Sequence, residues 1–100
     1  MNMIGAYSVS KTALIGLVKA LSFELAARDI RINSICPGVV KTKFAGALTE
    51  QDEFKEQIAM GRYAEPWEMG GMISFLSDNN RASYITGENY TVCGGGNFRL

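Results

Sequence analysis

Apolar residues recur at intervals of three and four through the first quarter of the chain. The repeating positions are Leu14, Leu17, Val18, Leu21 and Leu25. This spacing predicts an amphipathic helix over residues 6–27. Its most apolar part, residues 12–27, carries Lys19 and Glu24 and is too short for a membrane span. We therefore expect a helix that packs one face against the rest of a domain.

Four shorter elements are expected after this helix. Residues 30–36 and 89–93 predict strands, because each run is short and is bounded by turn residues. Between them, residues 49–60 begin with an N-capping signal and predict a short polar helix. Residues 66–76 predict a helix with proline at its first position. The order strand, helix, strand is typical of the parallel sheet of an α/β fold.

Charge and cysteine content exclude several kinds of chemistry. Ten basic and ten acidic residues give a net charge of zero without a basic cluster, so nucleic acid and an anionic membrane are poor candidates for a partner. The chain holds no histidine, which excludes a His-based triad or a His-containing zinc site within it. Cys36 and Cys93 fall in the two predicted strands, where buried free thiols are expected and no metal site is predicted.

Tyr7 and Lys11 are the most informative pair in the sequence. Residues four apart on a helix project from the same face, with Cβ atoms about 5–6 Å apart. A free phenol has a pKa near ~10 and transfers protons poorly at neutral pH, but a fixed ammonium beside it favours the phenolate. The pair can therefore act as an acid/base device. A solvated lysine beside a half-buried tyrosine is the alternative interpretation of the same spacing.

A longer pattern surrounds this pair. After Tyr-x-x-x-Lys, the helix and a strand lead into Pro37-Gly38-Val39-Val40-Lys41-Thr42. Further along come Arg62, Glu65-Pro66, residues 82–88 and Gly94-Gly95-Gly96. Together these motifs resemble the short-chain dehydrogenase/reductase family over essentially all 100 residues. Residues 82–88, the triple glycine and Arg99-Leu100 are most similar to the family's peroxisomal, NADP-dependent carbonyl and retinal reductases.

The resemblance implies the C-terminal portion of a doubly wound, parallel-sheet Rossmann domain over residues 1–100. In this α/β fold the Tyr-Lys helix would span residues 6–27 and a nicotinamide-side loop would span residues 37–42. A substrate lid would occupy residues 43–62, and the last helix and strand would occupy residues 66–93. The lid sequence is amphipathic, so a flap over an apolar substrate and a solvated surface helix both remain open.

Roles also follow from the resemblance. Tyr7 would donate a proton to the carbonyl oxygen of the substrate as hydride arrives from the nicotinamide. Lys11 would stabilise the phenolate and hydrogen-bond the nicotinamide ribose, since an ammonium offers three donors. Residues implied to bind the cofactor, which is NADP with NAD not excluded, are Tyr7, Lys11, Pro37, Gly38, Val40 and Thr42.

Each loop residue has its own implied role. Pro37 and Gly38 would let the backbone pass close to the nicotinamide ring. Val40 would meet the carboxamide through its backbone, and Thr42 would offer a hydroxyl near the carboxamide or the phosphates. The substrate would be a small carbonyl compound or alcohol, and the enzyme would be a homo-oligomer.

The family places its glycine-rich phosphate turn and its catalytic serine upstream of the tyrosine. No G-x-G-x-x-G occurs among the eleven glycines. We therefore expect the chain to be the C-terminal part of a longer reductase. The alternative is a truncated, non-catalytic fragment that pairs with full-length reductase subunits through uncovered helix faces and a free strand edge.

The ends of the chain bear on its location. Met1-Asn2-Met3-Ile4 lacks the basic region of a secretory signal, so a cytoplasmic or peroxisomal protein is expected. Peroxisomal import reads a C-terminal tripeptide of the Ser-Lys-Leu kind. The chain ends in Phe98-Arg99-Leu100, in which phenylalanine replaces the small residue of that signal.

Overall fold

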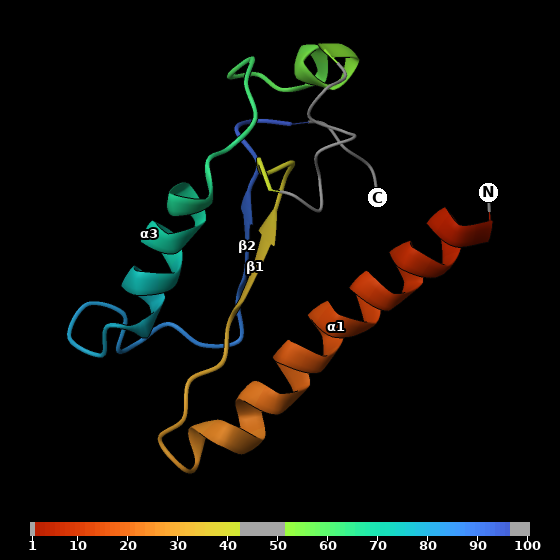
Figure 1. Cartoon of the computed structure of the whole chain (residues 1–100). Helices are drawn as coiled ribbons and strands as arrows, with labels where there is room; N and C mark the ends of the chain where they lie inside the picture. The colour runs from red at the N-terminus through yellow and green to blue at the C-terminus, as the bar shows by residue number, and fades with distance from the viewer. Residues whose placement is uncertain (1, 43–51, 97–100) are drawn as a thin grey trace.

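The structure is a computed structural model that describes residues 2–42 and 52–96, with side chains described over residues 9–42 and 55–96. Its elements in chain order are α1 (Asn2–Ala26), β1 (Ser34–Pro37), the 3₁₀-helix η1 (Asp52–Gln57), α3 (Pro66–Ser77) and β2 (Asn89–Val92). α1 and α3 lie on opposite sides of the two strands (Figure 1).

β1 and β2 form a parallel pair. Ser34 lies opposite Asn89 at one end of the register, and Pro37 lies opposite Val92 at the other. α3 comes between the two strands in the chain, so the strand-helix-strand order and the parallel sheet predicted from the sequence are confirmed.

β1 begins four residues later than the predicted strand at residue 30. The preceding residues are held by the loop before β2 rather than by a regular ladder. Ile32 accepts a hydrogen bond from the backbone N–H of Gly87, and its own N–H donates to Thr86 Oγ1 at 3.0 Å. Asn33 Nδ2 donates to the backbone oxygen of Ile85 at 3.0 Å. Side chains therefore satisfy backbone groups here that a longer strand would pair.

α1 ends close to the predicted boundary at residue 27. The N–H of Ile30 donates to the carbonyl of Leu25, and the N–H of Asp29 donates to that of Ala26. These are the two hydrogen bonds of a Schellman motif. The motif needs a left-handed residue, and Asp29 supplies it with φ 57°. An aspartate adopts this conformation more readily than a bulky residue does, so the chain can turn sharply into β1 without a glycine.

The predicted apolar face of α1 is only partly buried. Val18 is 5% exposed, whereas Leu14 and Leu17 are 55% and 52% exposed. The spacing indicated which side chains favour burial, but it could not indicate whether this chain contains the element that covers them. Much of the apolar surface of α1 is thus left uncovered by the described residues.

The short polar helix predicted over residues 49–60 is observed as the 3₁₀-helix η1. Its predicted start at Thr49 lies outside the described residues. The chain leaves η1 through i→i+3 bonds from the N–H of Ile58 to Lys55 and from that of Gly61 to Ile58. η1 thus ends at Gln57, three residues before the predicted boundary at residue 60. Gly61, with φ 71°, lies just after that boundary and turns the chain away.

α3 begins with Pro66 at its first position, as predicted. The N–H of Glu65 donates to Glu68 Oε1 at 2.9 Å, which satisfies a backbone donor at the start of the helix. At the other end, Arg31 Nη2 donates to the carbonyl of Leu76 at 2.7 Å. This arginine joins the segment before β1 to the last turn of α3.

Candidate cofactor-binding and catalytic site

Tyr7 and Lys11 both lie on the N-terminal half of α1, one helical turn apart. The Lys11 side chain is half-buried, and that of Tyr7 lies outside the described part of the chain. Figure 1 shows that the N-terminal end of α1 and the arrowheads of both strands point toward the same end of the molecule. Ligands of open α/β sheets bind at this end, beyond the carboxyl ends of the strands.

Pro37 and Gly38 form the exit from β1. Pro37 is the last residue of the strand, and the N–H of Gly38 donates to the carbonyl of Val92 at 3.0 Å. The predicted loop over residues 37–42 therefore starts with residues that still belong to the sheet. Because neighbouring residues of a strand face opposite edges, the missing N–H of Pro37 costs no bond to β2.

Val40 lies in a parallel bridge with Ala64. The bridge is made by its neighbours: the N–H of Ala64 donates to Val39 O at 3.1 Å, and the N–H of Lys41 donates to Ala64 O at 2.8 Å. The backbone groups of Val40 consequently point away from Ala64. Such groups can receive an amide ligand, as the predicted contact between Val40 and a carboxamide requires.

Thr42 is exposed and is the last described residue before the gap. Pro37, Gly38, Val40 and Thr42 therefore follow one another along a single segment, which is fixed on one side by β2 and on the other by Ala64. Residues 43–51 of the predicted lid lie outside the described residues.

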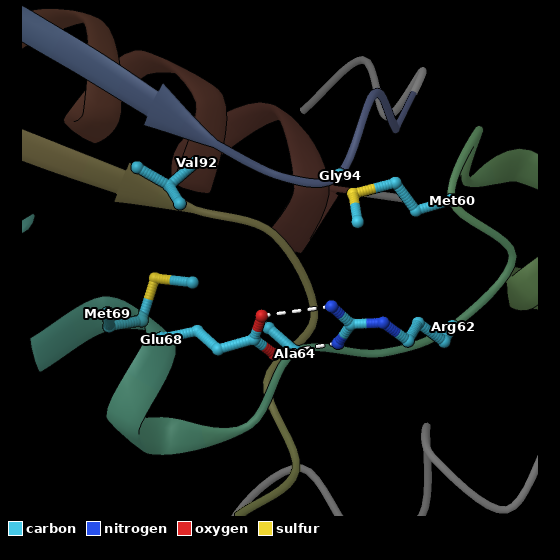
Figure 2. Close-up of a pocket in the computed structure, with 7 residues that line it drawn as sticks. All are labelled: Met60, Arg62, Ala64, Glu68, Met69, Val92 and Gly94. Atoms are coloured by element: carbon cyan, nitrogen blue, oxygen red, sulfur yellow. Dashed lines mark hydrogen bonds and ion pairs between the residues drawn. The ribbon is translucent and has the colours of Figure 1, made fainter. Parts of the chain in front are cut away.

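A shallow pocket of about 100 Å³ lies beside the start of α3 (Figure 2). It is lined by Met60, Arg62, Ala64, Glu68, Met69, Val92 and Gly94, none of which was predicted as a site residue. Met60 and Met69 reach into it from opposite sides in Figure 2. The sequence analysis missed this pocket, because its lining comes from segments that only the tertiary structure brings together.

An ion pair borders the pocket. Arg62 donates to both carboxylate oxygens of Glu68, at 2.7 and 2.9 Å. This pairing, helped by the N–H of Glu65, lowers the pKa of Glu68 from its ordinary value of 4.5 to about 2. The same pairing raises the pKa of Arg62. Both groups are therefore charged at neutral pH, and their ion pair holds the segment before α3 against the first turn of this helix.

Cys36 and Cys93 are both free, half-buried thiols. Within the described ranges, no cluster of three or more His, Cys, Asp or Glu side chains could hold a metal ion. Nor does any helix in those ranges have the length and apolar character needed to cross a membrane.

Comparison with known proteins identifies the family. A sequence profile described as enoyl-(acyl carrier protein) reductase matches residues 1–97. Dehydrogenase/reductase SDR family member 4 of Oryctolagus cuniculus is 46% identical over 97% of this chain. The match spans 38% of the relative, so this chain corresponds to little more than a third of that protein.

Solved structures agree with the sequence matches. The short-chain dehydrogenase/reductase of Serratia marcescens BCRC 10948 is 37% identical with a TM-score of 0.79, over 89% of this chain and 36% of its own. A 4-hydroxyisoleucine dehydrogenase complexed with NADH is 36% identical with a TM-score of 0.78, over 91% and 37%. The resemblance inferred from the Tyr-x-x-x-Lys and Pro-Gly motifs is thereby confirmed, as is the Rossmann-type α/β fold. The chain belongs to the short-chain dehydrogenase/reductase family of oxidoreductases.

Proposed function

We propose that the chain is the nicotinamide-side, C-terminal part of an NAD(P)H-dependent reductase that converts carbonyl compounds to alcohols. The observation that carries this proposal is that Tyr7 and Lys11 lie four residues apart in the N-terminal half of α1. The N-terminal end of this helix lies toward the end of the molecule to which both strands point (Figure 1). Family membership and the length of the relatives support the rest. Ketones, aldehydes and dicarbonyls, retinal included, are the substrate class.

The bound nicotinamide would supply a hydride to the carbonyl carbon. As the carbonyl π electrons move to oxygen, Tyr7 transfers its phenolic proton to that oxygen, which completes the alcohol and leaves a phenolate. Lys11 would stabilise the phenolate through its positive charge, and its three donors would also be available to the ribose hydroxyls of the bound cofactor. A proton from solvent then restores the phenol. In alcohol oxidation the same groups act in reverse order.

The segment after β1 fits a nicotinamide. Gly38 has no side chain that would keep a ligand away from the backbone. The backbone groups of Val40 point away from Ala64, where they can meet a carboxamide. Thr42, an exposed residue, lies at the end of the same segment. We propose NADP as the cofactor and NAD as the alternative, which the solved relative with bound NADH supports. Side-by-side assays with NADPH and NADH decide between them.

The test is turnover of a dicarbonyl by wild type and Tyr7→Phe, measured on the longest form of the protein that cells make. Loss of the phenolic proton donor should lower kcat at least about a hundredfold, the size of a general-acid contribution, and leave cofactor affinity nearly unchanged. Tyr84→Phe is the matched control, because Tyr84 is fully exposed and belongs to no proposed site. Equal kcat in wild type and Tyr7→Phe would refute the assignment.

The second candidate function is a non-catalytic fragment that pairs with full-length reductase subunits. Large apolar side chains on both described long helices favour it, because such surfaces ordinarily lie in an interface. Exposed fractions reach 71% for Val9 and 80% for Phe23 on α1, and 74% for Trp67 on α3. These faces can equally be covered by the rest of a single longer polypeptide.

Peptide mass spectrometry of the native protein separates the two functions. Peptides that continue upstream of Met1 into a glycine-rich strand-turn-helix favour the reductase. Co-purification of a 100-residue chain with a longer reductase, unaffected by Tyr7→Phe, favours the fragment. Imaging of the same native protein tests the proposed cytoplasmic or peroxisomal location.

A further inference from the structure

The carboxyl ends of β1 and β2 approach each other closely. Continuing the register past Pro37 and Val92 sets Gly38 opposite Cys93. A Cβ atom at Gly38 would lie 2.9 Å from the Cβ and 3.0 Å from the Cα of Cys93. Both distances are well inside the optimal carbon–carbon separation of about 3.5–4.0 Å. Only a residue without a side chain can therefore occupy position 38 while Cys93 stays where it is.

Gly38 is required by space rather than by backbone conformation. The described glycines with positive φ are Gly61, Gly87, Gly94 and Gly95, and Gly38 is not among them. An alanine at position 38 would have an allowed backbone and would still collide with Cys93. The contact itself is thus the reason for the glycine.

The contact determines the position of the segment that follows. On one side, the N–H of Gly38 bonds Val92 O at 3.0 Å, and Cys93 lies against its Cα. On the other side, Val39 and Lys41 are bonded to Ala64. Residues 38–41 therefore lie between Cys93 on one side and Ala64 on the other. A change in the size of the residue at position 93 must displace them toward or away from Ala64.

We propose that Cys93 is a positioning residue for the nicotinamide-side loop, acting through its packing on Gly38. The contact of the Cα and Cβ of Cys93 with Gly38 sets the position of residues 38–42. This position would bring the backbone of Val40 to the cofactor. The thiol sulfur takes no part, since the close contacts are to the Cα and Cβ. This inference rests on the proposed function for its effect on the cofactor, but its structural part can be measured without it.

The experiment compares Gly38→Ala, Cys93→Gly and the double variant in the longest natural form of the protein. One readout is amide hydrogen exchange at Lys41 and Ala64, the two donors of the bridge. The other is the KM for NADPH and kcat measured separately, because a merely structural loss lowers the active fraction and leaves KM unchanged. Gly70→Ala is the matched control, since a Cβ at Gly70 would meet nothing within 4 Å.

Gly38→Ala should raise the KM for NADPH about tenfold and speed exchange at both amides, as expected for overpacking. Cys93→Gly should speed exchange at Lys41, because it removes the Cβ that packs against Gly38. Cys93→Ala keeps this Cβ and should leave the exchange unchanged. The double variant should recover part of the loss. Recovery is incomplete because the Cα of Cys93 still lies 3.0 Å from the new Cβ.

Failure of the proposed function has a different signature. Wild-type protein that neither binds nor oxidises NADPH would refute the function, and exchange at Lys41 and Ala64 would still decide the positioning role. If Gly38→Ala does not fold, Cys93→Gly against Cys93→Ala gives that decision. Unchanged exchange in Cys93→Gly, or a double variant no better than Gly38→Ala, would overturn the inference.

Discussion

Ser22 on α1 lies directly against Gly87: a Cβ atom added to Gly87 would lie 2.7 Å from the Oγ of Ser22. Ser22 is 7% exposed, and its hydroxyl donates to the carbonyl of Lys19 at 2.6 Å. Next to this contact, Lys19 pairs with Glu88 at 3.6 Å. The C-terminal half of α1 is thereby fixed to the loop before β2, and the helix carries Tyr7 and Lys11 from that fixed point.

Gly87→Ala should therefore destabilise the protein. The new methyl group collides with Ser22, and a residue with a Cβ is strained at φ 74°. We expect the free energy of unfolding to fall by about 1–3 kcal/mol in urea denaturation. Gly16→Ala is the control on α1, where a Cβ meets nothing within 4 Å and a gain of up to about 1 kcal/mol is expected. Similar stability of the two variants would contradict the contact.

Asp29→Gly should stabilise the protein, because Asp29 holds a left-handed conformation with φ 57° at the end of α1. Glycine adopts it without steric cost, so the free energy of unfolding should rise by about 0.5–1 kcal/mol. Thermal unfolding of Asp29→Gly and Asp29→Val checks this, since a β-branched residue should have the opposite effect. A glycine variant less stable than wild type would show that the turn is held by something other than its backbone.

Arg31→Met should destabilise the protein, because Arg31 connects the segment before β1 to the end of α3. The guanidinium donates to Leu76 O at 2.7 Å, to Ile85 O at 3.2 Å and to Asn79 Oδ1 at 2.8 Å. Removing it takes the charged donor away from the Leu76 carbonyl, whereas the Ile85 carbonyl keeps its bond from Asn33 Nδ2. The loss should cost about 1–3 kcal/mol of unfolding free energy. Arg31→Lys should recover little of this stability, because an ammonium cannot reproduce the planar set of N–H donors of a guanidinium. Arg28→Met, at an exposed position, is the control, and an equal loss there would refute the role.

Glu68 should make the stability depend on acid pH. Its pKa is about 2 in the folded chain and 4.5 as its ordinary value, so between these values the unfolded chain binds more protons. The stabilisation is fully present above the ordinary value and is lost as pH falls toward 2. The stability difference between wild type and Glu68→Gln should shrink over that interval. Arg62→Met should reduce this pH dependence to the smaller part that the N–H of Glu65 causes, and an undiminished dependence there would contradict the pairing as its main cause.

The elements of the fold could be predicted more fully than their surroundings. Pro66 located the start of α3, and the apolar spacing located α1, because both signals are local. The start of β1 could not be found, since side chains of residues 54 positions away in the chain, such as Thr86, replace its ladder. Exposure of Leu14 could not be predicted either, because apolar spacing indicates which side chains favour burial and not whether another element covers them.

The candidate site shows the same division. Spacing predicted Tyr7 and Lys11 one turn apart, and both lie on α1. The approach of Pro37 and Gly38 to a nicotinamide stays a prediction. That Gly38 lies against Cys93 could not be predicted, because the contact joins two strands and depends on their register. The pocket lined by Met60 and Met69 likewise forms between a loop and a helix that only the tertiary structure brings together.

The most direct measurement of the central claim is deuteride transfer from C4-deuterated NADPH to a dicarbonyl, followed by mass spectrometry of the alcohol. In the longest natural form of the protein, wild type and Tyr84→Phe should place deuterium on the former carbonyl carbon. Tyr7→Phe should yield almost none, and Lys11→Met should yield little and bind the cofactor weakly. Deuterium transfer that is equal in wild type and Tyr7→Phe, or absent from wild type, would contradict the account.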